Sequence, residues 1–353
     1  MAESAWRPPR AFWCTGPVTA SAAFADLGTD AQVDLLRGVA TAAAPHFGLD
    51  VERLELVLHG FNTTFEVTAR DGRHVALRVN TNSLATPEHL TAQLAWVHAI
   101  ARDTGVGVPD PVPTLTGAPF TTVASAAAGR DFLVVAHAWL EGPDVEECDA
   151  EQAHALGEAM ATLHLHAARW RLPEGTSLPL FAEPLLGDAD RISTVDVPGP
   201  GGRAVLDTAL GRARAAFDTV LAGAEPVVVH GDLHGGNLKW HEGRLAVFDF
   251  DDAGLAVPAL DLAVATFYLR DAEGVPAEAA VRAGYAQVAP LPDLDPEVFE
   301  ALVASRQLLL ANSLLTSSTP EFRAMLPEYL GRTVTRLRHW LDTGRFVLDP
   351  PER

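Results

Sequence analysis

In the first part of the chain, the spacing between hydrophobic residues changes along the sequence. A spacing of three or four residues predicts helices, and alternation with polar residues predicts short strands. Residues 30–47 place apolar side chains every three or four positions, and Asp30 stands where a helix N-cap is expected. Apolar and polar residues then alternate in short stretches, and Asp71-Gly72 is a strong hairpin signal between two of them. A second helix is predicted from Thr86 to about residue 102. The predicted strands are residues 54–58, 64–69, 74–79, 120–124 and 132–138.

In the rest of the chain, apolar residues recur at the spacing of a helix almost throughout. Residues 105–119, which hold four prolines, are predicted as an extended connector, and the Pro/Gly-rich residues 196–203 as a surface loop. Strands followed by helices predict an α+β fold, with a small five-stranded antiparallel sheet and a larger helical part. The predicted helices are residues 150–169, 203–221, 258–270, 277–287, 296–315 and 320–343.

Length and composition narrow the class of protein. At 353 residues the chain fits two lobes that share a cleft, and 48% hydrophobic residues support a substantial core. The net charge of −20 argues against a nucleic-acid partner, because phosphates require a basic surface. Cys14 and Cys148 are the only cysteines, so no disulfide framework or zinc site is expected. Without a stretch of membrane-span or signal-peptide character, we expect a cytoplasmic protein with no membrane partner; its oligomeric state is not indicated.

Two motifs in the helical part carry candidate chemistry. Residues 230–237 read His-Gly-Asp-Leu-His-Gly-Gly-Asn, and residues 248–252 read Phe-Asp-Phe-Asp-Asp, with short predicted strands at 226–229 and 245–248. Phosphoryl transfer from a nucleotide needs a base for the attacking hydroxyl and oxygen ligands for Mg²⁺. The candidate base is Asp232, and the candidate metal ligands are Asn237, Asp249 and Asp251. Turn formation and helix capping are the structural alternatives for these residues.

With these motifs the chain resembles the aminoglycoside phosphotransferase family, the branch of the protein-kinase-like fold that phosphorylates hydroxyl groups of small molecules. The resemblance spans roughly residues 50–345. It implies a bilobal protein-kinase-like fold in which residues 1–137 form a β-rich nucleotide-binding lobe with a leading helix. Residues 138–143 would then be a hinge, and residues 144–353 a helical lobe with the catalytic loop and the substrate site.

The resemblance also implies where a nucleotide binds. The nucleotide-covering loop falls on residues 59–65, where Asn62, Thr63 and Thr64 are expected to contact phosphate groups. This loop has a single glycine, and an ordinary hairpin turn is the alternative. In the hinge, backbone atoms near Ala138 and Leu140 are expected to bind the edge of adenine.

Two residues depart from the family pattern. Arg78 stands where the family has its phosphate-contacting lysine, and a guanidinium can grip phosphate with two hydrogen bonds. Gln93 stands where a glutamate would pair with that cation, so we expect a hydrogen bond between Gln93 and Arg78 in place of an ion pair. His230 and Asp261 are expected to support the catalytic loop from behind.

The resemblance implies ATP and Mg²⁺ as cofactors and, as acceptor, a hydroxyl of a small molecule such as an aminoglycoside or an amino alcohol. A protein Ser/Thr kinase of the stress-response type is one alternative, although the chain after Asp249 leaves little room for an extended peptide. A nucleotide-binding pseudokinase scaffold is the other, favoured by the two departures. The sequence does not distinguish ATP from GTP. Acidic residues that could hold an amine on the acceptor are Asp252, Asp271, Glu273 and Glu328.

Overall fold

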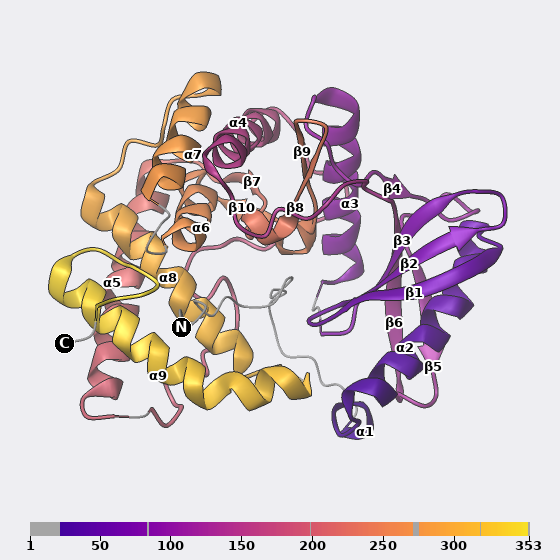
Figure 1. The fold of residues 1–353 in the computed structure, drawn as a ribbon, viewed down its shortest axis with the longest axis horizontal. Helices are drawn as coiled ribbons and strands as arrows, with labels where there is room; N and C mark the ends of the chain where they lie inside the picture. The colour runs from indigo at the N-terminus through magenta and orange to yellow at the C-terminus, as the bar shows by residue number, and fades with distance from the viewer. Residues whose placement is uncertain (1–21, 83–84, 198, 271–274, 318, 352–353) are drawn as a thin grey trace.

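The computed structural model describes most of the chain, from residue 22 to residue 351. Residues 1–21, 83–84, 198, 271–274, 318 and 352–353 lie outside the described part, and with them the candidate residues Asp271 and Glu273. Figure 1 shows a sheet with helix α2 on one side of the molecule and a larger group of helices on the other. This arrangement confirms the predicted α+β class.

The sheet is antiparallel and has six strands, one more than predicted. Its order is β1-β2-β3-β6-β4, and β5 pairs with another part of β6. The additional strand β4, Pro111–Val112, lies in the stretch predicted as a connector, at the edge of the sheet where a proline is tolerated. The other strands are β1 (Val51–His59), β2 (Thr63–Ala69), β3 (His74–Val79), β5 (Thr121–Ser125) and β6 (Arg130–Ala138).

Two helices flank the sheet, and their apolar side chains belong to two different hydrophobic cores. Helix α2 (Thr29–Ala43), preceded by α1 (Ala22–Ala25) and followed by the 3-10 turn η1 (Ala44–Phe47), packs its apolar side chains against the buried face of the sheet. Helix α3 (Pro87–Asp103) has Thr86 as its N-cap, whose side chain accepts a hydrogen bond from the His89 N–H. The apolar face of α3, including Trp96, belongs to the core of the helical part. The core therefore crosses the predicted boundary at residues 137–138, and that boundary stays a prediction.

The helical part contains two short antiparallel pairs of strands. Strand β7 (Val227–Val229) pairs with β10 (Gly254–Ala256), and β8 (Leu238–His241) pairs with β9 (Arg244–Val247). The 3-10 turns η2 (Gly235–Asn237) and η3 (Phe250–Asp252) connect these strands. No helix in the described part of the chain is long and apolar enough to span a membrane. The helices are α4 (Ala150–Ala167), α5 (Gly202–Gly223), α6 (Ala259–Leu269), α7 (Val275–Val288), α8 (Pro296–Leu314) and α9 (Pro320–Thr343).

Candidate active site

The loop after β7 is held in place by Asp261 on α6. The two carboxylate oxygens of Asp261 accept hydrogen bonds from the backbone N–H groups of His230 (2.9 Å) and Gly231 (2.8 Å). His164 on α4 lies 3.0 Å from the same carboxylate through its Nε2 atom. Because Asp261 is fully buried, these bonds fix the loop backbone to the helical core. The structure thus places Asp261 where the predicted supporting role requires it.

His230 joins the loop to the segment that follows β9. Its Nε2 lies 3.0 Å from the carbonyl of Phe248, so Nε2–H donates, and its Nδ1 accepts from the Asp232 N–H at 3.3 Å. Burial lowers the pKa of His230, which agrees with the neutral ring that this pattern requires. The ring also packs against Phe250, with ring centroids 4.6 Å apart. His230 therefore links the two motifs that the sequence singled out.

Gly231 allows the sharp turn that carries Asp232. Its φ is +82°, and a Cβ atom there would lie 2.3 Å from the Asp252 carbonyl oxygen. We expect Gly231→Ala to lower the free energy of unfolding by about 2–4 kcal/mol, since it adds a backbone clash to the cost of a positive φ. Gly72→Ala is the matched control, because Gly72 has a φ of +87° and nothing within 4 Å of its Cβ position. Urea unfolding measures both, and equal losses would contradict the clash.

Asp232 and Asn237 form one buried unit. The Asn237 Nδ2 donates to the Asp232 backbone carbonyl (2.8 Å) and approaches its carboxylate Oδ2 (3.2 Å). The other amide atom, Asn237 Oδ1, is buried and has no hydrogen-bond partner among the described residues. A buried carbonyl oxygen without a partner is costly unless a ligand satisfies it, and oxygen is the ligand atom that Mg²⁺ prefers. The donor set at this point therefore fits a divalent cation.

Arg306, from the middle of α8, forms a buried ion pair with Asp232. Its Nη2 contacts the Asp232 Oδ1 atom and lies 3.2 Å from the Tyr268 hydroxyl. The Tyr268 ring in turn stacks on His234, whose Nε2 is 3.4 Å from Asp232. Burial alone would raise the pKa of Asp232, but the charge of Arg306, helped by His234, lowers the pKa below its usual value. Sequence reasoning missed Arg306; the available signal was a lone arginine among the apolar residues of α8.

Asp249 follows β9 in a strained conformation. Its φ of 65° and ψ of 61° are left-handed, which is unusual for a residue other than glycine and is typical of functional sites. The N–H of the preceding Phe248 donates to the Asn237 carbonyl at 3.0 Å, so the Asp249 and Asn237 segments lie side by side. Phe250 packs edge-on against Trp96 of α3, with ring centroids 5.6 Å apart. Two of the three predicted metal ligands, Asn237 and Asp249, thus lie on adjacent segments.

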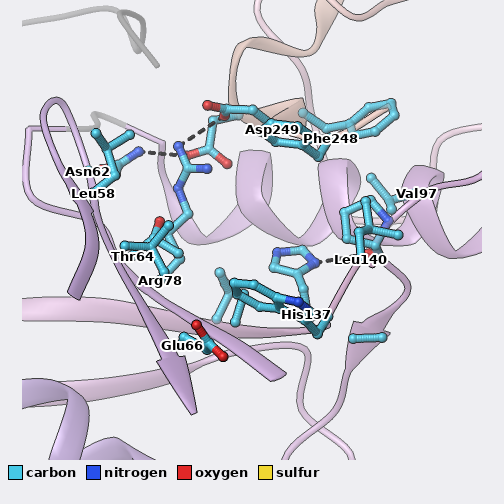
Figure 2. Close-up of a pocket in the computed structure, with 18 of the residues that line it drawn as sticks. Leu58, Asn62, Thr64, Glu66, Arg78, Val97, His137, Leu140, Phe248 and Asp249 are labelled. Atoms are coloured by element: carbon cyan, nitrogen blue, oxygen red, sulfur yellow. Dashed lines mark hydrogen bonds and ion pairs between the residues drawn. The ribbon is translucent and has the colours of Figure 1, made fainter. Parts of the chain in front are cut away.

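Arg78 of β3 is the cation that faces these carboxylates. Its Nη2 lies 3.0 Å from Asp249 and 2.8 Å from Asp251, and the Asn62 Nδ2 donates to Asp251 at 2.6 Å (Figure 2). Burial raises the pKa of Asp251 to about 6, and nearby Asp249 adds to this against the lowering effect of Arg78. Gln93 donates to the Asp251 backbone carbonyl at 2.6 Å, and its acceptor atom Oε1 has no partner among the described residues, so the expected hydrogen bond from Arg78 is not formed.

Asp251, the third predicted metal ligand, is held by Arg78 and Asn62. The guanidinium of Arg78 contacts both Asp249 and Asp251 and so offsets the repulsion between their charges. No group of three or more His, Cys, Asp or Glu side chains that could hold a metal occurs among the described residues. Asn237, Asp249 and Asp251 stay predicted metal ligands.

A cavity of about 410 Å³ opens between the sheet and these residues. Of the residues predicted to bind the nucleotide, Asn62, Thr64, Arg78, Ala138 and Leu140 line it (Figure 2). Its other walls are largely apolar, which suits a flat ring system. They include Leu56, Leu58, Ala76, Val97, Val135 and Phe248.

Two predicted nucleotide contacts differ from expectation. Thr63 does not line the cavity, because its side chain is fully buried and its hydroxyl bonds to His59 (2.8 Å) and Thr81 (2.9 Å). The Ala138 N–H donates to the Asp110 carbonyl at 2.9 Å, so a ligand at Ala138 would have to use the carbonyl of that residue.

Comparison with known proteins assigns the family. Residues 54–297 match the model of the phosphotransferase enzyme family. An uncharacterized protein of Deinococcus radiodurans is 30% identical over 296 residues, which cover 81% of this chain and 82% of the relative. The chain therefore belongs to the phosphotransferase enzyme family, and the predicted resemblance is confirmed. By this membership it is a phosphotransferase.

Solved structures with the same fold include two small-molecule kinases. The microcompartment-associated aminopropanol kinase has a TM-score of 0.74 and 25% identity, over 88% of this chain and 99% of its own. The amicoumacin kinase hAmiN, solved with AMP-PNP, Ca²⁺ and Ami, has a TM-score of 0.68 and 18% identity, over 86% of this chain and 93% of its own. These similarities agree with the predicted protein-kinase-like fold.

Proposed function

We propose that the protein transfers the γ-phosphoryl group of ATP, with Mg²⁺, to a hydroxyl group of an amine-bearing small molecule. The observation that carries the proposal is the Asp232–Asn237 unit: a buried carboxylate beside an amide whose Oδ1 atom lacks a partner among the described residues. A base and a metal-ligand oxygen at one point are what phosphoryl transfer to a hydroxyl requires.

The nucleotide would occupy the 410 Å³ cavity, with its phosphates at the end that holds Arg78 and its base between the apolar walls. Arg78 would exchange part of its contact with Asp249 for phosphate oxygens, since guanidinium binds both groups well. Asn237 and Asp249 would hold Mg²⁺, which when bound neutralises charge on the β- and γ-phosphates. Asn62 and Thr64 line the same end of the cavity.

Asp232 would act as the base. Arg306 keeps its carboxylate ionised, and Asn237 fixes the orientation of that carboxylate from the other side. An ionised carboxylate in this position orients the acceptor hydroxyl and takes its proton late in the transfer. Because both oxygens of Asp232 already have protein partners, the acceptor hydroxyl must approach a remaining lone pair.

A second cavity, of about 230 Å³, is a candidate entrance for the acceptor. It is lined by His234 and Tyr268, the stacked pair beside Asp232, and by the acidic residues Glu146, Glu147 and Asp149. A carboxylate-rich wall favours a cationic acceptor, and the structural neighbour named aminopropanol kinase supports an amino alcohol. Among the acidic residues named from the sequence, Glu328 is instead exposed and paired with Arg332 on α9.

The test is an acceptor screen that measures ADP release and identifies the phosphorylated product by mass spectrometry. Each amino alcohol or aminoglycoside is paired with a neutral analogue that keeps the hydroxyl but lacks the amine. We expect Mg²⁺-dependent turnover on an amine-bearing member and at least about tenfold lower kcat/KM on its neutral partner, from loss of a charge-assisted contact. Transfer to generic protein substrates, or nucleotide binding with no turnover on any acceptor, would overturn the proposal.

A further inference from the structure

The nucleotide cavity is lined by apolar side chains and by polar ones, among them a histidine. His137 of β6 lines the cavity together with Ala138 and Leu140, and Figure 2 shows it among the drawn lining residues. On the neighbouring strand β3 its register partner is Ala76, whereas the partner of Arg78 is Val135. Val135 and His137 are two residues apart on β6, so their side chains lie on the same face of the strand. Because Val135 pairs with Arg78, His137 lies two residues away from the end of the cavity where Arg78 contacts the acidic residues.

The hydrogen bonding of His137 defines which of its nitrogens can accept. Its Nδ1 lies 3.0 Å from the Pro109 carbonyl oxygen, which can only accept, so Nδ1 carries the hydrogen. Burial lowers the pKa of His137 to about 4, and the bond to Pro109 only partly opposes this, so the ring is neutral at physiological pH. A neutral imidazole with its hydrogen on Nδ1 has a lone pair on Nε2. His137 is thus a hydrogen-bond acceptor inside the cavity.

The position of His137 matches the base of a nucleotide whose phosphates lie at Arg78. The apolar residues Ala76, Leu140 and Phe248 line the cavity with His137, so a flat ring placed among them meets the imidazole as a hydrogen-bond acceptor. From these residues we infer that His137 selects adenine over guanine nucleotides by accepting, at Nε2, a hydrogen bond from the 6-amino group of adenine. The inference rests on the proposed function, because it assumes that a purine triphosphate occupies this cavity.

The two purines differ at the atom that this acceptor would meet. Adenine carries an amino donor at C6, whereas guanine carries a carbonyl acceptor there. Guanine would place two acceptors against each other, and a buried polar group left without its partner weakens binding by about 10- to 100-fold. Protonation of Nε2 to rescue the contact is unfavourable near neutral pH, because burial lowers the pKa of His137 to about 4.

The test compares four triphosphates by calorimetry in the presence of Mg²⁺. ATP and 2,6-diaminopurine triphosphate carry the 6-amino group, whereas GTP and inosine triphosphate carry the 6-oxo group, and the 2-amino group is present in one member of each pair. We expect the two 6-amino compounds to bind at least about tenfold more tightly than the two 6-oxo compounds. If inosine triphosphate binds as well as ATP, the 6-position is not read and the inference is wrong.

Variants at position 137 assign the effect to this side chain. His137→Leu replaces the imidazole with an apolar side chain of similar bulk. It should weaken ATP binding by about tenfold and leave the binding of inosine triphosphate unchanged, so that the preference disappears. His137→Gln should also lose the preference, since its amide can present either a donor or an acceptor. The control is Val135→Ala, on the same strand and in the same cavity, which should weaken all four compounds alike.

The possible outcomes separate this inference from the proposed function. A preference for the 6-amino compounds that survives in both His137 variants would overturn the role of His137 and leave the kinase assignment intact. Absence of binding by all four triphosphates to the unaltered protein would overturn the proposed function, and the inference with it. Thermal unfolding of each variant shows whether a loss of binding reflects loss of the fold.

Discussion

Asp232→Asn is expected to lower kcat for phosphoryl transfer by about 10²–10⁴-fold, because the amide cannot accept the proton of the acceptor hydroxyl. The change removes one charge and keeps the shape of the side chain, so binding of MgATP in the 410 Å³ cavity, to which Asp232 does not contribute, should persist. Steady-state kinetics with the acceptor found in the screen measures kcat, and calorimetry measures the affinity for MgATP.

Loss of the carboxylate also leaves the charge of Arg306 without its partner Asp232, so stability must be controlled separately. Asp188→Asn serves this purpose, since Asp188 is another buried carboxylate of the helical part, where it accepts from Ser313 at 3.1 Å. We expect Asp188→Asn to keep its kcat. Turnover by Asp232→Asn within about threefold of the unaltered enzyme would remove Asp232 from the role of base.

The catalytic loop could be predicted from the sequence because the residues that define it are close together in the chain. Asp232 and Asn237 are five residues apart between two short strands, and the structure brings them together through bonds within the loop. Arg306 could not be predicted, since its contact with Asp232 joins residues 74 positions apart on different elements. No periodicity within α8 indicates which buried group its arginine meets, because that depends on how α8 packs against the loop.

Strand geometry explains why the nucleotide contacts were only partly predicted. Successive side chains of a strand point to opposite faces, so Thr63 and Thr64 could not both face a ligand. The burial of β2 alternates along its length, with Thr63 and Phe65 in the core and Thr64 and Glu66 toward the cavity. Applied to the sequence, this alternation would have selected one threonine. The pairing of Arg78 with Asp249 and Asp251 joins the sheet to the segment after β9, so it depends on tertiary structure.

Arg306→Met is expected to lower the free energy of unfolding by about 3–5 kcal/mol, because it leaves the charge of Asp232 buried without a partner. Arg306 and Asp232 are 2% exposed each, so water cannot replace the lost contact. Arg332→Met is the control: its pair with Glu328 lies on the surface of α9, and such pairs contribute about 0–1 kcal/mol. Urea unfolding with a common m-value measures both changes.

A double-mutant cycle separates the ion pair from the packing of the arginine side chain. If the charges are the cause, Asp232→Asn combined with Arg306→Met should be more stable than the sum of the single losses predicts, by at least about 1–2 kcal/mol, because neither charge is then left alone. Additive losses would show that Arg306 stabilises the protein through packing alone.

The same variants bear on catalysis, since an arginine that keeps Asp232 ionised should be needed for turnover. Arg306→Met should therefore lower kcat even where the fold is intact. An unchanged kcat would mean that Asp232 stays ionised without Arg306.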